Sequence, residues 1–174
     1  GAYRAVKHLI ETGKRKIAIC TGTPNLLISR NRLKGYKQAL SEHDIPVYEQ
    51  YIFEGESPEE VEKEMGKLLD LPNRPDGIFA ISDLTMAGIM QAIYSRRLRI
   101  PDDIGVIGFC EEPFSLMCIP PVSTIMPMGY EIGKTAASLL FKKILDGEDT
   151  LTVGRVELTG ELIARASTIA DQRH

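Results

Sequence analysis

The chain has 174 residues, of which 43% are hydrophobic, and its formal net charge is −3. This length and composition are enough for the core of one domain, or of one domain with part of a second. The acidic balance argues against binding of nucleic acid through a basic surface of this chain.

Helical and extended patterns alternate from residue 2 to residue 109. The helical segments carry apolar residues three or four positions apart, and the extended segments are short continuous apolar runs. This order predicts an α/β fold in which a parallel sheet is covered by helices on both faces. The expected helices are residues 2–12, 29–43, 57–71 and a helix that follows Asp83. The expected strands are residues 16–20, 50–53, 77–81 and 104–109.

The alternation stops after Pro120. The remaining helix and strands have no obvious place in the parallel sheet, so we expect the chain to leave this unit, cover a neighbouring one and return. The segments are an extended stretch at residues 123–125, a helix at 129–146, strands at 155–159 and 161–164, and a disordered end at 171–174.

Two loops are expected to meet at one edge of the sheet. Ser82 and Asp83 follow one predicted strand, and Cys110, Glu111 and Glu112 follow the next one along the chain. Parallel strands end at the same edge, and ligands of open α/β sheets bind there, so these side chains define a predicted binding crevice. Asp83 has an alternative role as the cap of the helix that follows it.

The sequence shows no sign of a catalytic or cofactor site. It contains no GxGxxG, P-loop, GxSxG or HExxH motif. Its three histidines, His8, His43 and His174, are scattered over a helix, a helix end and the tail. We therefore predict that the chain is not an enzyme and uses neither a metal nor a cofactor.

The cysteines point to a reducing compartment. Cys20, Cys110 and Cys118 form no CxxC pair and have no metal-ligand spacing. An odd number of cysteines without such a framework is typical of the cytoplasm, where we expect this protein. The chain starts at Gly1 inside a helical pattern, so we also expect it to be a fragment of a longer protein.

Six segments, taken together, resemble a known family. They are GAYRAVKHLIETGKRKIAI (1–19), SRNRLKGYKQAL (29–40), RPDGIFAISDLTMAGIMQAI (74–93), RIPDDIGVIGF (99–109), PPVSTIMPMGYEIGKTAASLL (120–140) and ELIARAS (161–167). In this order and spacing they resemble the effector-binding core of the lac-repressor (LacI/GalR) family of bacterial transcription regulators. No single segment is specific, but the series covers nearly the whole chain.

The resemblance implies a periplasmic-binding-protein-like fold and a division of the chain into three parts. Residues 1–125 would be the C-terminal effector-binding subdomain, residues 126–159 a crossover helix and strand of the N-terminal subdomain, and residues 160–174 the return strand and tail. The rest of that subdomain and a helix-turn-helix head that binds operator DNA would lie outside this chain. The two subdomains would close on a small molecule, often a sugar.

The resemblance also assigns effector contacts to residues of the crevice. Arg32 matches the family's ligand-binding arginine, and its planar guanidinium suits paired hydroxyls or a carboxylate. The alternative is a solvated helix arginine. Ser82 stands where the family usually has an asparagine that touches the ligand, and it keeps a donor and an acceptor but loses reach. Asp83, beside it, completes this side of the expected site.

A departure from the family pattern occurs at Cys110. The family usually has an aspartate there, which accepts hydrogen bonds from sugar hydroxyls, and a thiol is a poor substitute. This substitution weakens the expectation of a typical sugar effector, and Glu111 is the acid expected to reach the ligand instead. For Cys110 itself, a reactive thiol and a small buried apolar group are the two alternatives.

Residues 113–119 are unusually apolar for a loop, which indicates a covered surface. In the family, this region and the helix after Asp83 form the dimer interface. We therefore expect a two-fold homodimer interface, with local packing under the loop as the alternative. Its predicted members are Met86, Met90, Ile93, Phe114, Leu116, Met117 and Ile119.

Three functions are compatible with such a fold. A ligand-responsive transcription regulator is favoured by the cysteines, the apolar segment 113–119 and the sequence of residues 99–109. A periplasmic-type solute-binding protein of a sugar transporter shares the fold, so fold alone does not separate the two. A fold-related enzyme of nucleotide chemistry is opposed by the missing phosphate-binding glycines.

Overall fold

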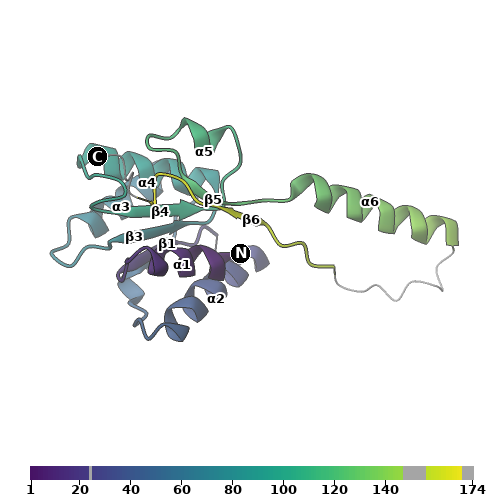
Figure 1. The fold of residues 1–174 in the computed structure, drawn as a ribbon, viewed down its shortest axis with the longest axis horizontal. Coiled ribbons are helices and arrows are strands. Elements are labelled where there is room, and N and C mark those ends of the chain that lie inside the picture. The colour runs from purple at the N-terminus through teal and green to yellow at the C-terminus, as the bar shows by residue number, and fades with distance from the viewer. Residues whose placement is uncertain (24, 147–155, 170–174) are drawn as a thin grey trace.

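A computed structural model describes residues 1–23, 25–146 and 156–169. Figure 1 shows a central sheet with helices on both sides and one long helix, α6, that extends away from this body. The strand order is β2-β1-β3-β4-β5-β6, and neighbours are parallel except β6, which runs antiparallel to β5. The strands are β1 (Ile17–Cys20), β2 (Ile52–Phe53), β3 (Gly77–Ala80), β4 (Gly105–Gly108), β5 (Ser123–Met126) and β6 (Glu161–Ile163). The predicted α/β architecture is thus confirmed.

Helices cover both faces of the sheet because its strands are apolar on both faces. In β1, Ile17 and Ile19 pack with α1 and α2, whereas Ala18 and Cys20 point to the opposite face and pack with α3 and α4. Two separate cores result, one on each side of the sheet. The helices of the described residues are α1 (Ala2–Glu11), α2 (Leu27–Glu42), α3 (Pro58–Leu69), α4 (Asp83–Ser95), the one-turn α5 (Phe114–Met117) and α6 (Gly129–Asp146).

The parallel strands end level with one another. Cys20 of β1 pairs in register with Phe53 of β2 and Ala80 of β3, and Ala80 pairs with Gly108 of β4. The loops that follow these strands therefore emerge along one edge of the sheet. The predicted meeting of the two polar loops at this edge depends on this register.

Serine side chains cap the starts of two helices. Ser57 caps α3 by accepting a hydrogen bond from Glu60 N–H at 3.2 Å, and Pro58 occupies the first turn. Ser82 caps α4 through a reciprocal pair of bonds with Thr85, the pattern known as a capping box. At this start the cap is Ser82 rather than Asp83.

Two predicted segments have a different local structure. In residues 50–53 only Ile52 and Phe53 form a strand, because Glu49–Tyr51 make a 3-10 turn closed by a 2.9 Å bond from Tyr51 N–H to the Tyr48 carbonyl. The apolar loop contains the one-turn helix α5, in which Met117 N–H donates to the Pro113 carbonyl at 3.1 Å.

The return of the chain to the sheet was only partly predicted. The strand expected at residues 155–159 is wrong for 156–159, which are irregular, because pairing with β5 begins only where Glu161 meets Met126. The strand expected at residues 161–164 is confirmed as β6. Residue 155 and the tail at 171–174 lie outside the described residues.

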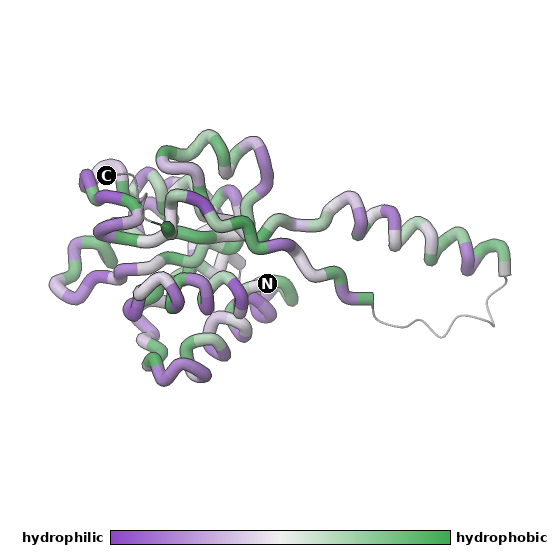
Figure 2. The backbone as a smooth tube through the Cα atoms, in the orientation of Figure 1, coloured by the Kyte–Doolittle hydropathy of each residue, from purple (hydrophilic) through white to green (hydrophobic). Residues whose placement is uncertain are grey.

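Helix α6 has an uncovered apolar surface. Figure 2 shows hydrophobic residues along its length, well away from the body of the domain. Phe141 is 63% exposed and Leu145 is 81% exposed. The described part of this chain provides no cover for these side chains, which is the arrangement expected of a helix that belongs with a neighbouring unit.

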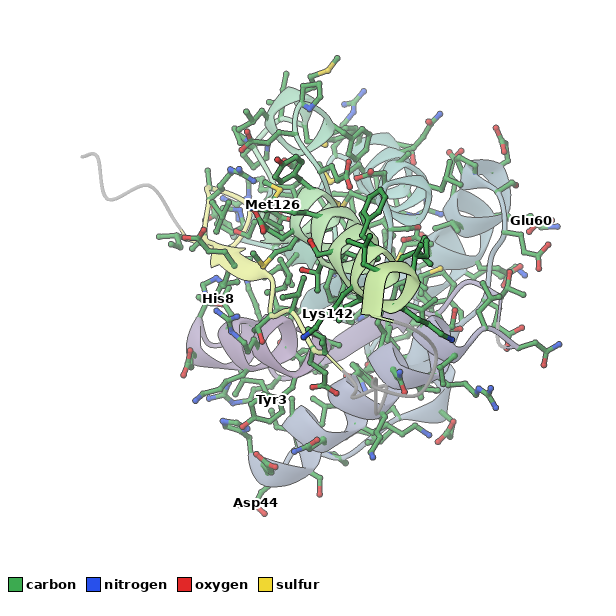
Figure 3. All side chains as sticks on the ribbon, turned by 90° about the vertical axis from the view of Figure 1, so that its right-hand side faces the viewer. Tyr3, His8, Asp44, Glu60, Met126 and Lys142 are labelled. Carbon is green, nitrogen blue, oxygen red and sulfur yellow. The ribbon has the colours of Figure 1, made fainter. Side chains whose placement is uncertain are left out.

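A polar network fastens the returning segment to the sheet. Thr168 Oγ1 lies 2.7 Å from His8 Nε2 of α1 and 2.6 Å from Ser123 Oγ of β5. Ser167 Oγ accepts from Ser123 N–H at 2.7 Å and donates to the Val106 carbonyl at 2.6 Å. Figure 3 shows His8 on α1 beside the returning segment. These bonds join the start and the end of the described chain.

We expect Gly88→Ala to destabilise the chain by about 1–3 kcal/mol, because overpacking forces a backbone or side-chain shift. A Cβ at Gly88 would lie 2.3 Å from the Pro58 carbonyl oxygen and 2.7 Å from Val61 Cβ, so α3 would have to move. Gly133→Ala in α6 is the control, since nothing lies within 4 Å of its Cβ position. Urea unfolding measures both, and equal losses of stability in the two variants would contradict this account.

Candidate functional site

Arg32 lies at the edge where the strands end, in the second turn of α2. Its guanidinium carbon is 3.9 Å from the centroid of the Phe109 ring, in a cation–π stack. Its Nη1 donates a hydrogen bond to the backbone carbonyl of Ile81, at the end of β3. The ring and the carbonyl hold the guanidinium in one orientation, so the solvated alternative is wrong.

The guanidinium lines a pocket with a volume of about 610 Å³. Ile28 and Asn31 of α2 line it as well, together with Phe109 and with Thr159 of the returning segment. Burial lowers the pKa of Arg32, but an arginine still stays protonated at neutral pH. The pocket therefore holds a fixed positive charge against an aromatic wall.

Asp83 and Glu111 meet, as the strand register predicted. Asp83 Oδ1 accepts a hydrogen bond from Glu111 N–H at 3.2 Å, which ties the loop after β3 to the loop after β4. The Glu111 side chain is exposed, whereas Ser82 is occupied with capping α4. The structure thus brings these three residues together, but it does not put them among the residues that line the Arg32 pocket.

The side chain of Cys110 is fully buried and belongs to the core on the α3 and α4 side. Burial raises the pKa of its thiol strongly. Its backbone is held by Thr124 Oγ1, which accepts from Cys110 N–H at 2.9 Å and donates to the Cys110 carbonyl at 2.7 Å. The expected ligand contact by Cys110 is therefore corrected to a packing role, and the reactive-thiol alternative is not supported.

A second hollow, of about 620 Å³, lies on the opposite side of the sheet between α4 and α5. Met90, Gln91 and Tyr94 of α4 line it, together with Phe114 and Met117 of the apolar loop. We call this hollow the α4–α5 groove. Tyr94 and the loop are joined by a 2.9 Å bond from the Tyr94 hydroxyl to the Ile119 carbonyl.

The predicted interface residues divide into surface and core. Met117 is 75% exposed and Ile119 80% exposed, and Leu116 is also exposed. Met86 and Ile93 are fully buried in the domain core, so their predicted contact with a partner is corrected. The helix presents another face outward. Its exposed members, Leu84 and Tyr94, were missed because the apolar repeat of α4 marks the buried face, not the outer one.

Phe109 and Arg165 are further residues that sequence reasoning missed. Phe109 counted only as the last residue of a strand, yet its ring supports Arg32. Arg165 follows β6, is 11% exposed, and donates to Glu112 Oε1 at 2.5 Å and to the Val122 carbonyl at 2.8 Å. Partners distant in the sequence decide both roles, so no local pattern could reveal them.

Comparison with known proteins identifies this arrangement. The family model described as "Periplasmic binding protein-like domain" matches residues 6–168. The chain belongs to this family. It is the type of domain that LacI-family transcription regulators use to bind effectors. The transcriptional repressor CytR of Escherichia coli K12 is 36% identical over 97% of this chain and 49% of its own length.

Solved structures agree with this assignment. A regulatory protein of the LacI family from Chloroflexus aggregans is 32% identical, with a TM-score of 0.88, over 96% of this chain and 60% of that one. The transcriptional regulator CelR, solved with cellobiose, is 28% identical, with a TM-score of 0.86, over 96% of this chain and 51% of that one. The chain spans about half the length of the curated relatives it matches.

Two further observations delimit the chemistry of the described residues. Nowhere in these ranges do three or more His, Cys, Asp or Glu side chains gather so that they could hold a metal ion. Among the described helices, none is both long and apolar enough to cross a membrane.

We expect Thr124→Val to destabilise the chain by about 1–3 kcal/mol, because it leaves the buried Cys110 N–H without an acceptor. Thr124→Ser keeps the hydroxyl and is the matched control. Urea unfolding and site-resolved thiol labelling measure the effect, and Cys110 should label faster in the valine variant than in the serine variant. If the serine variant labels as fast as the valine variant, the hydroxyl does not hold this loop.

Proposed function

We propose that this chain is the effector-binding and dimerisation part of a ligand-responsive, cytoplasmic transcription regulator whose DNA-binding head lies outside it. The Arg32 pocket at the carboxyl edge of the sheet carries this proposal, because that edge is where α/β domains of this shape bind ligands. The repressor CytR and the LacI-family structures, which match nearly the whole chain, support it.

The effector would act by favouring one orientation of two subdomains. In this proposal, residues 1–125 would form one of them, residues 126–159 would belong to the other, and residues 160–174 would be the return strand and tail. The chain passes outward at β5 and back at β6, and these two strands pair side by side. A molecule bound at the pocket changes operator affinity only if it binds one orientation better than the other. The change would alter the spacing of two DNA-binding heads on an operator.

The α4–α5 groove and the exposed side chains beside it would form the homodimer interface. Leu116, Met117 and Ile119 present apolar surface next to Tyr94, which is the composition found in the centre of protein interfaces. A second copy of the chain, related by a two-fold axis, would cover the same surface on both subunits.

The regulatory proposal is tested with the longer polypeptide that contains this chain. Operator fragments are selected from genomic DNA, and their affinity is measured with and without fractionated small metabolites. We expect one fraction to change operator affinity by about 5- to 150-fold, the usual range of allosteric coupling. Arg32→Met should abolish this response. Arg30→Met should keep it, because Arg30 is exposed and does not line the pocket.

Two outcomes would argue against this function. If the polypeptide selects no DNA but still binds a metabolite, a solute-binding protein is the better interpretation. If no molecule that binds the polypeptide changes its operator affinity, the pocket does not regulate DNA binding.

We expect Leu116→Asp combined with Met117→Asp to weaken the dimer at least tenfold, because charges would be buried at the centre of an apolar interface. Leu71→Asp is the control, since Leu71 is another exposed apolar residue and does not line the groove. Sedimentation velocity over a range of concentrations measures both variants. An unchanged dimer in the double variant would place the interface elsewhere.

A further inference from the structure

The positive charge of Arg32 has no acidic partner within the described part of the chain. Its contacts are the Phe109 ring and the Ile81 carbonyl. No ion pair joins it to a carboxylate there. Burial is the main cause that lowers its pKa, and the one neighbour that acts in the opposite direction is the thiol of Cys110. Since burial keeps that thiol protonated, it does not neutralise the guanidinium.

The acids in the loops after β3 and β4 have other partners or face the solvent. Asp83 accepts from Glu111 N–H at 3.2 Å, and the exposed Glu111 side chain projects from that loop. Glu112 binds Arg165 at 2.5 Å. The loops after β3 and β4 therefore supply no counter-charge to Arg32. Glu157 lines the same pocket, but none of the ion pairs among the described residues joins it to Arg32. A half-buried charge is costly without a counter-charge.

The hydrogen bonding of Arg32 shows which of its donors remain available. Nη1 is used by the Ile81 carbonyl. Nε–H and Nη2–H have no hydrogen-bond partner among the described residues, and these two groups form the parallel side-on fork of a guanidinium. This fork matches the spacing of two oxygens of a carboxylate or a phosphate.

Arg96 of the same chain shows the fork in use. Its Nε donates to Asp70 Oδ1 at 2.8 Å and its Nη2 donates to Asp70 Oδ2 at 2.7 Å. Arg32 has the same pair of donors without an aspartate on them, and its side chain lines a pocket. Its guanidinium is already held by a stack and one backbone bond, so little orientational freedom would be lost on binding.

We propose that the effector carries an acidic group, a carboxylate or a phosphate, that binds the Nε and Nη2 fork of Arg32. The inference rests on the proposed function, because it specifies the ligand of that same pocket. The neighbouring walls are consistent with it. Phe109 and Ile28 are apolar, and the lining also contains a second basic residue, Lys34, and one acid, Glu157. A neutral polyol would leave the charge of Arg32 without a counter-charge.

The test compares acids with neutral counterparts on the longer polypeptide that contains this chain. The probes are D-glucuronate and D-glucose 6-phosphate against D-glucose, D-galacturonate against D-galactose, and inorganic phosphate alone. Calorimetry and thermal unfolding are measured at 20 mM and 200 mM NaCl. We expect at least one acid to bind at least ten times more tightly than its neutral counterpart, and its affinity to fall with salt.

Variants connect that preference to the fork. Arg32→Gln should remove the preference for the acid, and Arg32→Lys should keep part of it, because lysine retains the charge without the parallel donors. Arg30→Gln, two positions away and outside the pocket, should behave as the unmodified protein. The difference between carboxylate and phosphate probes tells which of the two groups the fork prefers.

Several results would overturn the inference. Equal or tighter binding of the neutral sugars would do so while leaving the proposed function intact, since an effector would still bind at the pocket. Undiminished binding of the acids to Arg32→Gln would place the acidic group elsewhere. Binding of no acid would overturn it as well, and the operator measurements described above would then decide the proposed function independently.

Discussion

The whole arrangement depends on a short parallel sheet that must be covered on both faces. Strands of four residues, such as β1 and β3, are buried at every position, so alternate side chains enter two different cores. Helices can satisfy this requirement only by crossing over the sheet between strands. The crossovers keep the strands parallel and in register, and the register brings Ile81, Asp83 and Phe109 to one edge. The pocket exists because of this constraint.

Backbone groups at that edge hydrogen-bond to side chains of the candidate site and its surroundings. The carbonyl of Ile81, directly after β3, accepts from Arg32, and the side-chain hydroxyl of Thr124 binds both the N–H and the carbonyl of Cys110. Position 110 can therefore carry a thiol in place of the family's usual acid while the loop keeps its conformation, because Thr124 binds the backbone of residue 110 and not its side chain.

Sequence patterns were informative where a local rule decides the structure. Short apolar runs alternating with helical patterns predicted the sheet and its helices, and the predicted helix starts at Ser57 and after Ser82 agree with α3 and α4. Sequence patterns failed where a residue's role depends on a contact with a residue distant in the sequence. Met86 and Ile93 were expected at an interface because the resemblance assigns their helix to one, and the apolar repeat alone does not say whether such residues face a partner or the domain core, where they lie.

The same limit applied to the candidate site. Arg32 was predicted through a resemblance, but its stack on Phe109 joins residues 77 positions apart, and no local pattern carries that information. Cys110 shows the opposite case. Its apolar character favoured a buried role from the start, while the family pattern at that position favoured a ligand contact, and burial in the core decided between them.

Segment 109–117 is the place where pocket, returning chain and groove meet. Phe109 supports Arg32, Glu112 binds Arg165 beyond β6, and Phe114 and Met117 line the α4–α5 groove. Arg165 also donates to Ser115 Oγ at 3.2 Å, which joins the returning segment to α5. A change in the angle between two subdomains would bend the chain at β5 and β6, beside Arg165. Segment 109–117 thus connects, over nine residues, the pocket of the proposed effector with the surface of the proposed dimer, and coupling between them would require that the segment has two arrangements.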